Sequence, residues 1–377
     1  MYIRKQQLLL LLFIIFCNCS KNKEIIDDTV INDYVKSEQL STIEERLIDT
    51  IFFKNYSIIP LETTNESLFK NINRICRYND MIYIYDGRMS KIIIFDENGK
   101  YVNNIHNIGQ GPKEYISAID FCVDEITGDL ILMCDKPYKI IRFSKDGKFI
   151  NEINFSGLKM SITMDSGYFL CESFNTSEDC EIECFDNKFN LIYSKLRKFK
   201  TEKNSCFSGG KSLVKNKNIY YTRRFDPSIY FLNKDCIVKK YEFNFGKYKV
   251  PIELSEEEDC DNFFNSIRDN KYIFSITNVV ESERYILFNT NLCICLYEKK
   301  TNKLKAFNVL YNTSLLFGSN KFFVNEGCEN SLITLFQPNW LENYDEETIK
   351  NNSVLKNLLS NSKEYDNPIL IIFDFKE

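Results

Sequence analysis

Short apolar runs separated by polar turns recur along most of the chain and predict a protein built from β-strands. Residues 82–105 read IYIYDGRMSKIIIFDENGKYVNNI, and residues 131–153 read ILMCDKPYKIIRFSKDGKFINEI. In both segments an apolar strand ends in aspartate, a turn leads into Lys-Ile-Ile, and a glycine turn precedes Lys-aromatic-aliphatic. Gly99 and Gly147 mark a spacing of 48 residues. Self-similarity at this period is typical of the blades of a β-propeller.

Further groups of short strands follow at similar spacing, so the pattern predicts six blades. The later groups cover 162–196, 212–243, 273–309 and 321–375. The sixth group lacks an outer strand, and YSIIPLE at 56–62 has no other place. We expect this strand to close the ring, because pairing the two ends of the chain leaves no open sheet edge. The predicted fold is an all-β, six-bladed β-propeller over residues 56–377, with small helical insertions on one face.

Long connections interrupt the blades, and by strand register they all lie on one face of the ring. The two that are expected to hold helices cover about 245–272 and 338–367. Ser255–Glu258 has the pattern of a capping box, and Ile349, Leu355, Leu358 and Leu359 recur at helical spacing. Long insertions in compact domains are often functional. Their aromatic residues either line a ligand groove or seat the helices on the sheet: Phe263, Phe264, Trp340 and Tyr344.

The chain begins with the features of an export signal. Arg4 and Lys5 precede an apolar run over 8–16, which is too short for a bilayer that needs ~20 helical residues. The segment resembles a bacterial lipoprotein signal, in which residues 1–18 are removed and Cys19 carries the lipid. A plain secretory peptide and a cytoplasmic chain with an apolar end are the alternatives. Residues 19–55 are polar and are expected to be a tether, which places the protein in the cell envelope, anchored to the outer membrane.

The charge of the chain argues against nucleic acid as a partner. Removal of residues 1–18 changes the net charge from −5 to −7, and no basic block is present. An anionic membrane surface would not attract such a chain, so the lipid would be its only membrane anchor. The chain has 14 cysteines but no CxxC pair, and most stand inside strand-like runs. We expect them to be small buried apolar residues rather than a disulfide framework.

Several kinds of catalytic chemistry are excluded by composition. The chain has one histidine, His106, so a metal site that needs two histidines is impossible, and no EF-hand loop is present. A Ser-His-Asp triad would have to use His106, and the GxSxG turn is absent. We therefore predict no metal and no cofactor. Carboxylate pairs of the kind used in glycoside chemistry stay open, because sequence spacing says nothing across blades.

The stretch NIGQGPKEY at 107–115 is the most unusual connection, and it has a structural and a functional interpretation. It lacks the third glycine of GxGxxG and the Gly-Lys-Ser/Thr of a P-loop. In the structural interpretation, Gly109 and Gly111 adopt positive φ and Pro112 fixes the turn. Glu114 then accepts bonds from backbone donors, and Tyr115 wedges between two blades.

In the functional interpretation, the same loop lies at the mouth of the central channel and contacts a ligand. The candidate ligand-binding residues are Asp86, Arg88, Gln110, Lys113, Glu114 and Asp135.

Three segments together resemble the six-bladed β-propeller lipoproteins of Bacteroidetes. They are Asp96 to Lys100, the Gly-x-Gly-Pro-x-Glu-Tyr loop from Gly109 to Tyr115, and Asp120 to Asp124. The closing ILIIF strand is also similar, and the resemblance covers roughly residues 56–377. Lys113 departs from the pattern, since the family often has glycine there. The family has no settled biochemical activity, so the resemblance implies a fold and an exported protein rather than a function.

The functional hypothesis is an exported, lipid-anchored binding module for a protein, peptide or glycan on the loop-rich face. The fold, the clustered insertions and the shortage of catalytic motifs favour it. One alternative is a carbohydrate-active lyase or hydrolase that uses carboxylates in the central funnel. Another is a structural subunit of an outer-membrane complex.

Overall fold

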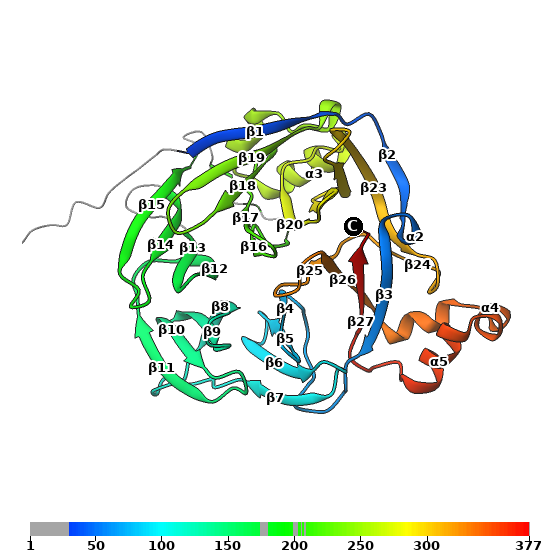
Figure 1. Ribbon diagram of the computed structural model, residues 1–377, viewed down its shortest axis with the longest axis horizontal. Helices are drawn as coiled ribbons and strands as arrows, with labels where there is room; N and C mark the ends of the chain where they lie inside the picture. Colours follow the sequence, from blue (N-terminus) through cyan, green and yellow to red (C-terminus); the bar gives the residue numbers. More distant parts are fainter. Residues whose placement is uncertain (1–29, 174–179, 199–202, 205, 207–208, 377) are drawn as a thin grey trace, which may run out of the picture.

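Six sheets, antiparallel except for the outermost strand of two of them, stand around a central axis in the computed structural model (Figure 1). The structure describes residues 30–173, 180–198, 203–204, 206 and 209–376. Each sheet contains four consecutive antiparallel strands from the inner to the outer edge of a blade, with the sixth completed by a strand from the start of the chain. The predicted all-β, six-bladed β-propeller with helical insertions is therefore confirmed.

Twelve consecutive strands form the first three blades. Blade one consists of β4 (Arg74–Tyr78), β5 (Met81–Asp86), β6 (Lys91–Asp96) and β7 (Tyr101–Ile105). Blade two consists of β8 (Ser117–Val123), β9 (Leu130–Lys136), β10 (Tyr138–Phe143) and β11 (Phe149–Asn154). Blade three consists of β12 (Lys159–Asp165), β13 (Tyr168–Ser173), β14 (Cys180–Phe185) and β15 (Leu191–Arg197).

The last three blades each include a segment from the start of the described chain. Blade four has β16 (Leu213–Lys215), β17 (Ile219–Tyr221), β18 (Ser228–Leu232), β19 (Ile237–Asn244) and, outermost, β1 (Val30–Gln39). Blade five has β20 (Ile276–Glu281), β21 (Tyr285–Thr290), β22 (Ile294–Glu298), β23 (Lys303–Asn312) and β2 (Ile43–Ile48), and β24 (Phe317–Ser319) also pairs with β23. Blade six has β25 (Phe323–Val324), β26 (Ser331–Phe336), β27 (Ile369–Phe375) and β3 (Phe53–Pro60).

The strands in the middle of each blade are apolar because neighbouring blades cover both of their faces. In β6, five consecutive residues from Lys91 to Phe95 are buried, whereas the outer strand β11 is exposed at five of its six positions. Apolar side chains of adjacent blades pack together, as Tyr85 of blade one does against Phe121 of blade two. The core is thus a ring of interfaces between blades.

The prediction that residues 19–55 form a polar tether is wrong from residue 30 onward, because this segment forms strands. β1 pairs in parallel with β19, and β2 pairs in parallel with β23, so the chain runs along the outer rim (Figure 1). An outermost strand is exposed on both faces and gains its place through backbone pairing, so it shows no apolar pattern. Two leucines of this segment are buried: Leu40, directly after β1, is 1% exposed, and Leu47 in β2 is 0% exposed.

The ring closes between the two ends of the described chain. β3 pairs antiparallel with β27, from Phe53 opposite Phe375 to Pro60 opposite Ile369. The strand begins three residues before the predicted 56–62 and ends two residues earlier. The short helix α2 (Asp49–Phe52) leads into it, and the Asp49 carboxylate accepts a hydrogen bond from the hydroxyl of Thr313 at 2.9 Å.

Helices occupy both predicted insertions. The connection from β19 to β20 holds η1 (Gly246–Tyr248), η2 (Ile252–Glu256) and α3 (Cys260–Asn270), and the connection from β26 to β27 holds η3 (Pro338–Asn343), α4 (Glu346–Asn351) and α5 (Ser353–Asn361). The expected helix start at Ser255 is wrong, because the carbonyl of Ser255 instead accepts hydrogen bonds from the backbone N–H groups of Lys203 and Asn204. The cap of α3 is Asp259, whose carboxylate accepts from the N–H of Asn262. None of the helices in the described ranges is long and apolar enough to cross a membrane.

One disulfide joins two of the long connections. Cys206, before blade four, is bonded to Cys260 at the start of α3, and their Cα atoms are 5.7 Å apart. Nine other cysteines in the described ranges carry free thiols, and seven of these nine are buried. Cysteine therefore serves mainly as a small core residue here, as the sequence predicted.

Removing this disulfide should lower the free energy of unfolding by about 2 to 4 kcal/mol, because the bond closes a long loop in the unfolded chain. The measurement is denaturant unfolding of the Cys206→Ala/Cys260→Ala variant under oxidising conditions. Reductant should destabilise the original protein and leave the double variant unchanged. Equal stability of the two proteins without reductant would show that the bond does not contribute.

Candidate functional site

The six residues predicted to bind a ligand do not form one site. Arg88, Gln110 and Lys113 have exposed side chains, whereas Glu114 and Asp135 are partly buried. Ser117 donates its hydroxyl to the carboxylate of Asp135. Among these six residues, all of which the structure describes, no ion pair and no hydrogen bond between two side chains is present; the one bond between two of them runs from the backbone N–H of Arg88 to the Asp86 carboxylate.

Asp86 is a structural residue rather than the predicted ligand residue. Its carboxylate is buried and accepts hydrogen bonds from the backbone N–H groups of Lys70 (2.6 Å), Asn71 (3.3 Å), Arg88 (2.9 Å) and Met89 (3.1 Å). These bonds hold the connection between β3 and β4 against the end of β5. The sequence could not show this, since the bonded residues lie up to 16 positions away.

The loop between β7 and β8 is built around Glu114 and Tyr115. The Glu114 carboxylate accepts a hydrogen bond from the N–H of Gly111 at 2.9 Å, and the buried Tyr115 donates its hydroxyl to the carbonyl of Ser90 at 2.8 Å. Neither Gly109 nor Gly111 has positive φ, so that part of the structural interpretation is wrong. Positive φ instead falls on Lys113, at 60°. Gly109 is needed for space, because a Cβ there would lie 2.1 Å from Oε2 of Glu114.

Two substitutions in this loop should therefore have opposite effects. Gly109→Ala should lower the free energy of unfolding by about 1.5 to 3 kcal/mol, since the new methyl group displaces the Glu114 carboxylate from its backbone donor. Lys113→Gly should raise it by up to about 1 kcal/mol, because relief of the left-handed backbone exceeds the added freedom of the unfolded chain. Thermal or denaturant unfolding measures both. Gly109→Ala should cost little in a Glu114→Ala background, and an undiminished cost there would contradict the steric explanation.

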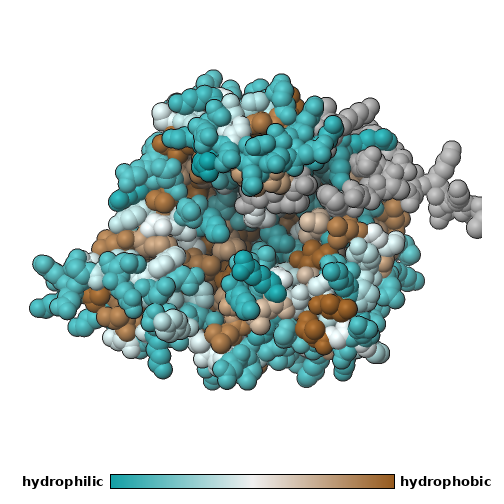
Figure 2. All heavy atoms as spheres, turned by 180° about the vertical axis from the view of Figure 1, so that it is seen from behind, coloured by the Kyte–Doolittle hydropathy of each residue, from teal (hydrophilic) through white to brown (hydrophobic). Residues whose placement is uncertain are grey.

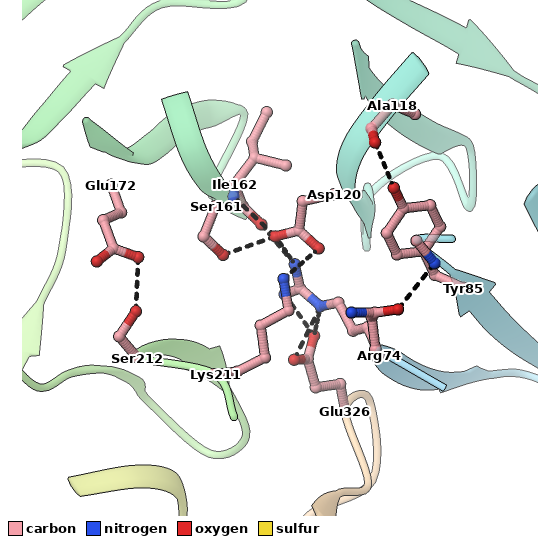
Figure 3. A network of polar contacts seen from close by, with 12 residues as sticks. Arg74, Tyr85, Ala118, Asp120, Ser161, Ile162, Glu172, Lys211, Ser212 and Glu326 are labelled. Atoms are coloured by element: carbon pink, nitrogen blue, oxygen red, sulfur yellow. Dashed lines mark hydrogen bonds and ion pairs between the residues drawn. The ribbon is translucent and has the colours of Figure 1, made fainter. Parts of the chain in front are cut away.

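Charged side chains from several blades pair with one another at the inner edges of the sheets, and Arg74, Asp120 and Glu326 are buried there. Arg74 of β4 lies between Asp120 of β8 (2.9 Å) and Glu326 of the β25–β26 connection (2.6 Å), and Lys211 approaches Asp120 at 2.8 Å (Figure 3). Arg74 also donates to the carbonyl of Ile162 at 2.7 Å. The network links blades one, two, three, four and six, so it fixes the blades relative to one another.

The pKa values in this network follow from burial and from the number of cations around each acid. Burial lowers the pKa of Arg74, but Asp120 and Glu326 more than compensate and raise it above its usual value. Burial opposes ionisation of Asp120, but Arg74 and Lys211 overcome it and lower its pKa. Burial raises the pKa of Glu326, which has Arg74 as its one ion-pair partner among the described residues. The two acids thus shift in opposite directions because Asp120 contacts two cations.

A groove between blades six and one is the strongest candidate for a ligand site. It has a volume of about 480 Å³. Its walls are residues 68–72 before β4, residues 319–321 before β25, and residues 337–340 and 365–368 at the two ends of the helical insertion of blade six. All of these connections are of the types that emerge on the loop-rich face. We call it the blade six–one groove.

Hydrogen bonds hold the walls of this groove in place. Asp86 fixes the backbone of Lys70 and Asn71, and Lys91 donates to the carbonyls of Glu66 and Leu68. On the opposite wall, the Asn367 amide donates to the carbonyls of Glu62 (3.0 Å) and Ser67 (3.2 Å). The groove is therefore preformed, as ligand pockets usually are.

Aromatic side chains line the groove. Trp340, at the start of the helical insertion, packs against Phe317 and Phe336, with ring centroids 4.9 Å and 5.8 Å away. Tyr365 is 82% exposed at the opposite end of the insertion. On the side of the molecule shown in Figure 2, hydrophobic side chains gather around a central depression within a mostly hydrophilic surface. Of the four insertion aromatics named from the sequence, Trp340 lines the groove, whereas Phe263 lies on the buried face of α3.

Most residues of the charged network and of the groove were not predicted from the sequence. An arginine inside the apolar strand RICRY is a signal for a buried ion pair, so the pairing of Arg74 could have been predicted from the sequence. Lys70 and Lys321 carry no such signal, because they stand in ordinary polar connections and line the same groove only in the folded ring.

These features define a six-bladed β-propeller with a buried charged network at the inner edges of its blades and a preformed groove on its loop-rich face. The chain belongs to the family described as a domain of unknown function (DUF4934), whose model matches residues 34–374.

Comparison with solved structures agrees with this fold. A Bacteroides fragilis protein named as a candidate exported protein has a TM-score of 0.73 and 22% identity, and the match covers 93% of this chain and 100% of that one. A member of the DUF4221 family from Bacteroides vulgatus has a TM-score of 0.47 and 13% identity, over 86% of this chain and 97% of that one. No curated protein matches the chain. The resemblance to Bacteroidetes β-propellers is confirmed at the level of the fold, while the loop motif as a family signature stays a prediction.

Proposed function

We propose that this protein is a non-enzymatic binding protein of the cell envelope that holds its ligand in the blade six–one groove. The observation that carries the proposal is the groove itself. Its volume of about 480 Å³ lies within the range of about 300–1,000 Å³ that is usual for small-ligand sites. The side chains of Lys70, Lys321 and Gln337 line it and make no hydrogen bond or ion pair with other described residues. They are therefore available to a ligand.

The composition of the groove supports binding rather than glycoside cleavage. Enzymes that cleave glycosides generally use two carboxyl groups on either side of the scissile bond. Asp366 is the one carboxylate among the described lining residues, and it accepts a hydrogen bond from the N–H of Lys363. The acids of the central channel, Asp120 and Glu326, are buried and paired with cations.

Trp340 allows a direct test, because it is the only tryptophan of the chain and it lines the groove. We expect saturable changes in tryptophan emission when the purified protein is titrated with fractions of envelope glycans and peptides. Trp340→Ala should weaken the binding by at least about tenfold, as loss of a central aromatic contact does. Phe264→Ala, an aromatic substitution on α3 outside the groove, should leave it unchanged.

Two results would count against the proposal. One is a ligand, detected by equilibrium dialysis, that leaves the tryptophan emission unchanged and tolerates Trp340→Ala. The other is chemical turnover of the bound ligand, which would contradict the non-enzymatic part.

The proposed location in the envelope rests on the export signal and on the disulfide. Disulfides persist mainly in oxidising compartments outside the cytoplasm, which suits the bond between Cys206 and Cys260. The structural neighbour from Bacteroides fragilis is also named for export. Cys19, the proposed lipid attachment site, lies outside the described residues.

Cys19→Ala should move the protein from the membrane fraction to the soluble fraction, because the lipid is its only proposed anchor and stable anchoring needs acyl chains. Cell fractionation followed by immunoblotting measures this. Cys17→Ala is the matched control and should stay membrane-bound. Release by Cys17→Ala and retention of Cys19→Ala would assign the lipid to the other cysteine.

A further inference from the structure

We infer that the ligand of the blade six–one groove is a saccharide with an anionic group, a carboxylate or a sulfate, on a pyranose ring. This inference rests on the proposed function and names the chemical class that the groove would take. Three features carry it: unpaired cations, an aromatic platform and a surplus of side-chain amides.

The charge of the groove is opposite to that of the whole chain. Lys70 and Lys321 line the groove with exposed side chains, whereas Asp366 is its one acid among the described residues. The chain as a whole has a net charge of −5. Two ammonium groups that have no ionic partner in the described part of the chain favour an anionic ligand, since charge-assisted hydrogen bonds are stronger than neutral ones.

The two lysines come from different connections, and each has a fixed backbone. Lys70 is held by the bond from its N–H to the Asp86 carboxylate at 2.6 Å. The carbonyl of Lys321 accepts a hydrogen bond from the hydroxyl of Ser319 at 2.6 Å. The cations therefore start from defined positions on separate walls, which reduces the loss of freedom when they bind an anion.

The aromatic residues provide a platform for the flat, apolar face of a sugar ring. Trp340 is held by Phe317 at an interplanar angle of 30° and by Phe336 at 84°, so its ring orientation is fixed. Tyr365 leaves 82% of its surface in water beside the same groove. A ligand with apolar C–H surface would cover these rings and gain from burial of apolar area.

The polar lining residues match sugar hydroxyls better than a peptide backbone. Asn71, Asn320 and Gln337 have side-chain amides, each of which donates and accepts hydrogen bonds as hydroxyl groups also do. Extended peptides usually bind by pairing with a free strand edge. Most lining residues of this groove lie outside strands; Ser319, Phe323 and Leu335 are the exceptions.

The test is a titration of the purified protein, followed by Trp340 emission and by calorimetry, with four probes. They are a uronic acid trisaccharide, a sulfated disaccharide, a neutral trisaccharide and a short acidic peptide. We expect at least one of the two anionic saccharides to bind at least about tenfold more tightly than the neutral one. Lys70→Glu and Lys321→Glu should each weaken that binding by about tenfold or more. Lys356→Glu, an exposed lysine of α5 outside the groove, should have no effect, and added salt should weaken the binding.

The outcomes separate this inference from the proposed function. If only one of the two anionic saccharides binds, that saccharide shows whether the ligand carries a carboxylate or a sulfate. Equal affinity for the neutral sugar, with no effect of either lysine substitution, overturns the anionic class but leaves the groove as the binding site. Preference for the acidic peptide overturns the saccharide. An anionic sugar that binds without a response of Trp340 and tolerates Trp340→Ala overturns both the inference and the proposed site.

Discussion

Replacing Arg74 by methionine should lower the free energy of unfolding by about 3 to 5 kcal/mol, the usual cost of removing one partner of a buried ion pair. Methionine has a similar length but no charge, so Asp120 and Glu326 would be left buried with less compensation. Denaturant unfolding of the protein that starts at residue 30 measures the loss. Arg88→Met, at an exposed position, should change the stability by no more than about 0.5 kcal/mol.

The loss from Arg74→Met should depend on pH in a defined direction. In the original protein Arg74 and Lys211 lower the pKa of Asp120, so the stability from its ionisation is present at neutral pH and is lost as the pH falls through that pKa. Without Arg74, burial is less opposed and the folded variant takes up protons on Asp120 and Glu326 more readily. The difference in the free energy of unfolding between the variant and the original protein should therefore shrink as the pH falls from about 8 to about 5. A difference that grows on acidification would contradict this account of the network.

Adding Glu326→Gln to Arg74→Met should recover part of the stability, because it removes one of the two uncompensated carboxylates. If the double variant is less stable than Arg74→Met alone, Glu326 contributes something other than its charge.

Truncation from the start of the chain should lower the free energy of unfolding even further than Arg74→Met does. The loss should increase stepwise as successive strands are removed. A protein that begins at residue 30 keeps every described strand and should match the full chain in stability. One that begins at residue 50 loses β1 and β2, with the buried Leu40 and Leu47, and should lose about 3 to 6 kcal/mol. One that begins at residue 63 loses β3 as well and should not fold cooperatively, because β27 is left with an unpaired edge.

Circular dichroism, size-exclusion chromatography and denaturant unfolding follow this series. Equal stability of the proteins that begin at residues 50 and 63 would show that β3 does not close the ring. Equal stability of those that begin at residues 30 and 50 would show that β1 and β2 contribute no packing.

The fold was predictable from the sequence because the blades repeat. The matching turns at Gly99 and Gly147 set the period, and continuous apolar strands such as KIIIFD reflect burial on both faces. β1 escaped prediction because eight of its ten residues are exposed. Such a strand owes its place to parallel backbone pairing with β19, and backbone groups are the same for every sequence.

The candidate site was less predictable than the fold, and the reason is topological. Lys70 and Lys321 are separated by some 250 positions in the chain. They share a groove only because the ring brings blade six beside blade one. The turn residues of the β7–β8 loop were singled out correctly as unusual, but their composition reflects the packing of Glu114 and Tyr115.

The placement of β1, β2 and β3 on the outer rim imposes an order on the folding of the chain during its synthesis. Val30 pairs with Ile237, and Pro60 pairs with Ile369. The strands at the start of the described chain therefore pair with strands that are synthesised much later. A chain that emerges from its N-terminus must keep β1 unpaired until blade four appears, β2 until blade five and β3 until blade six. Pairings so distant in sequence are slow to form. Unpaired strand edges invite aggregation during that wait. The charged, weakly apolar sequence of β1 suits such a segment, since it remains soluble until blade four is ready to receive it.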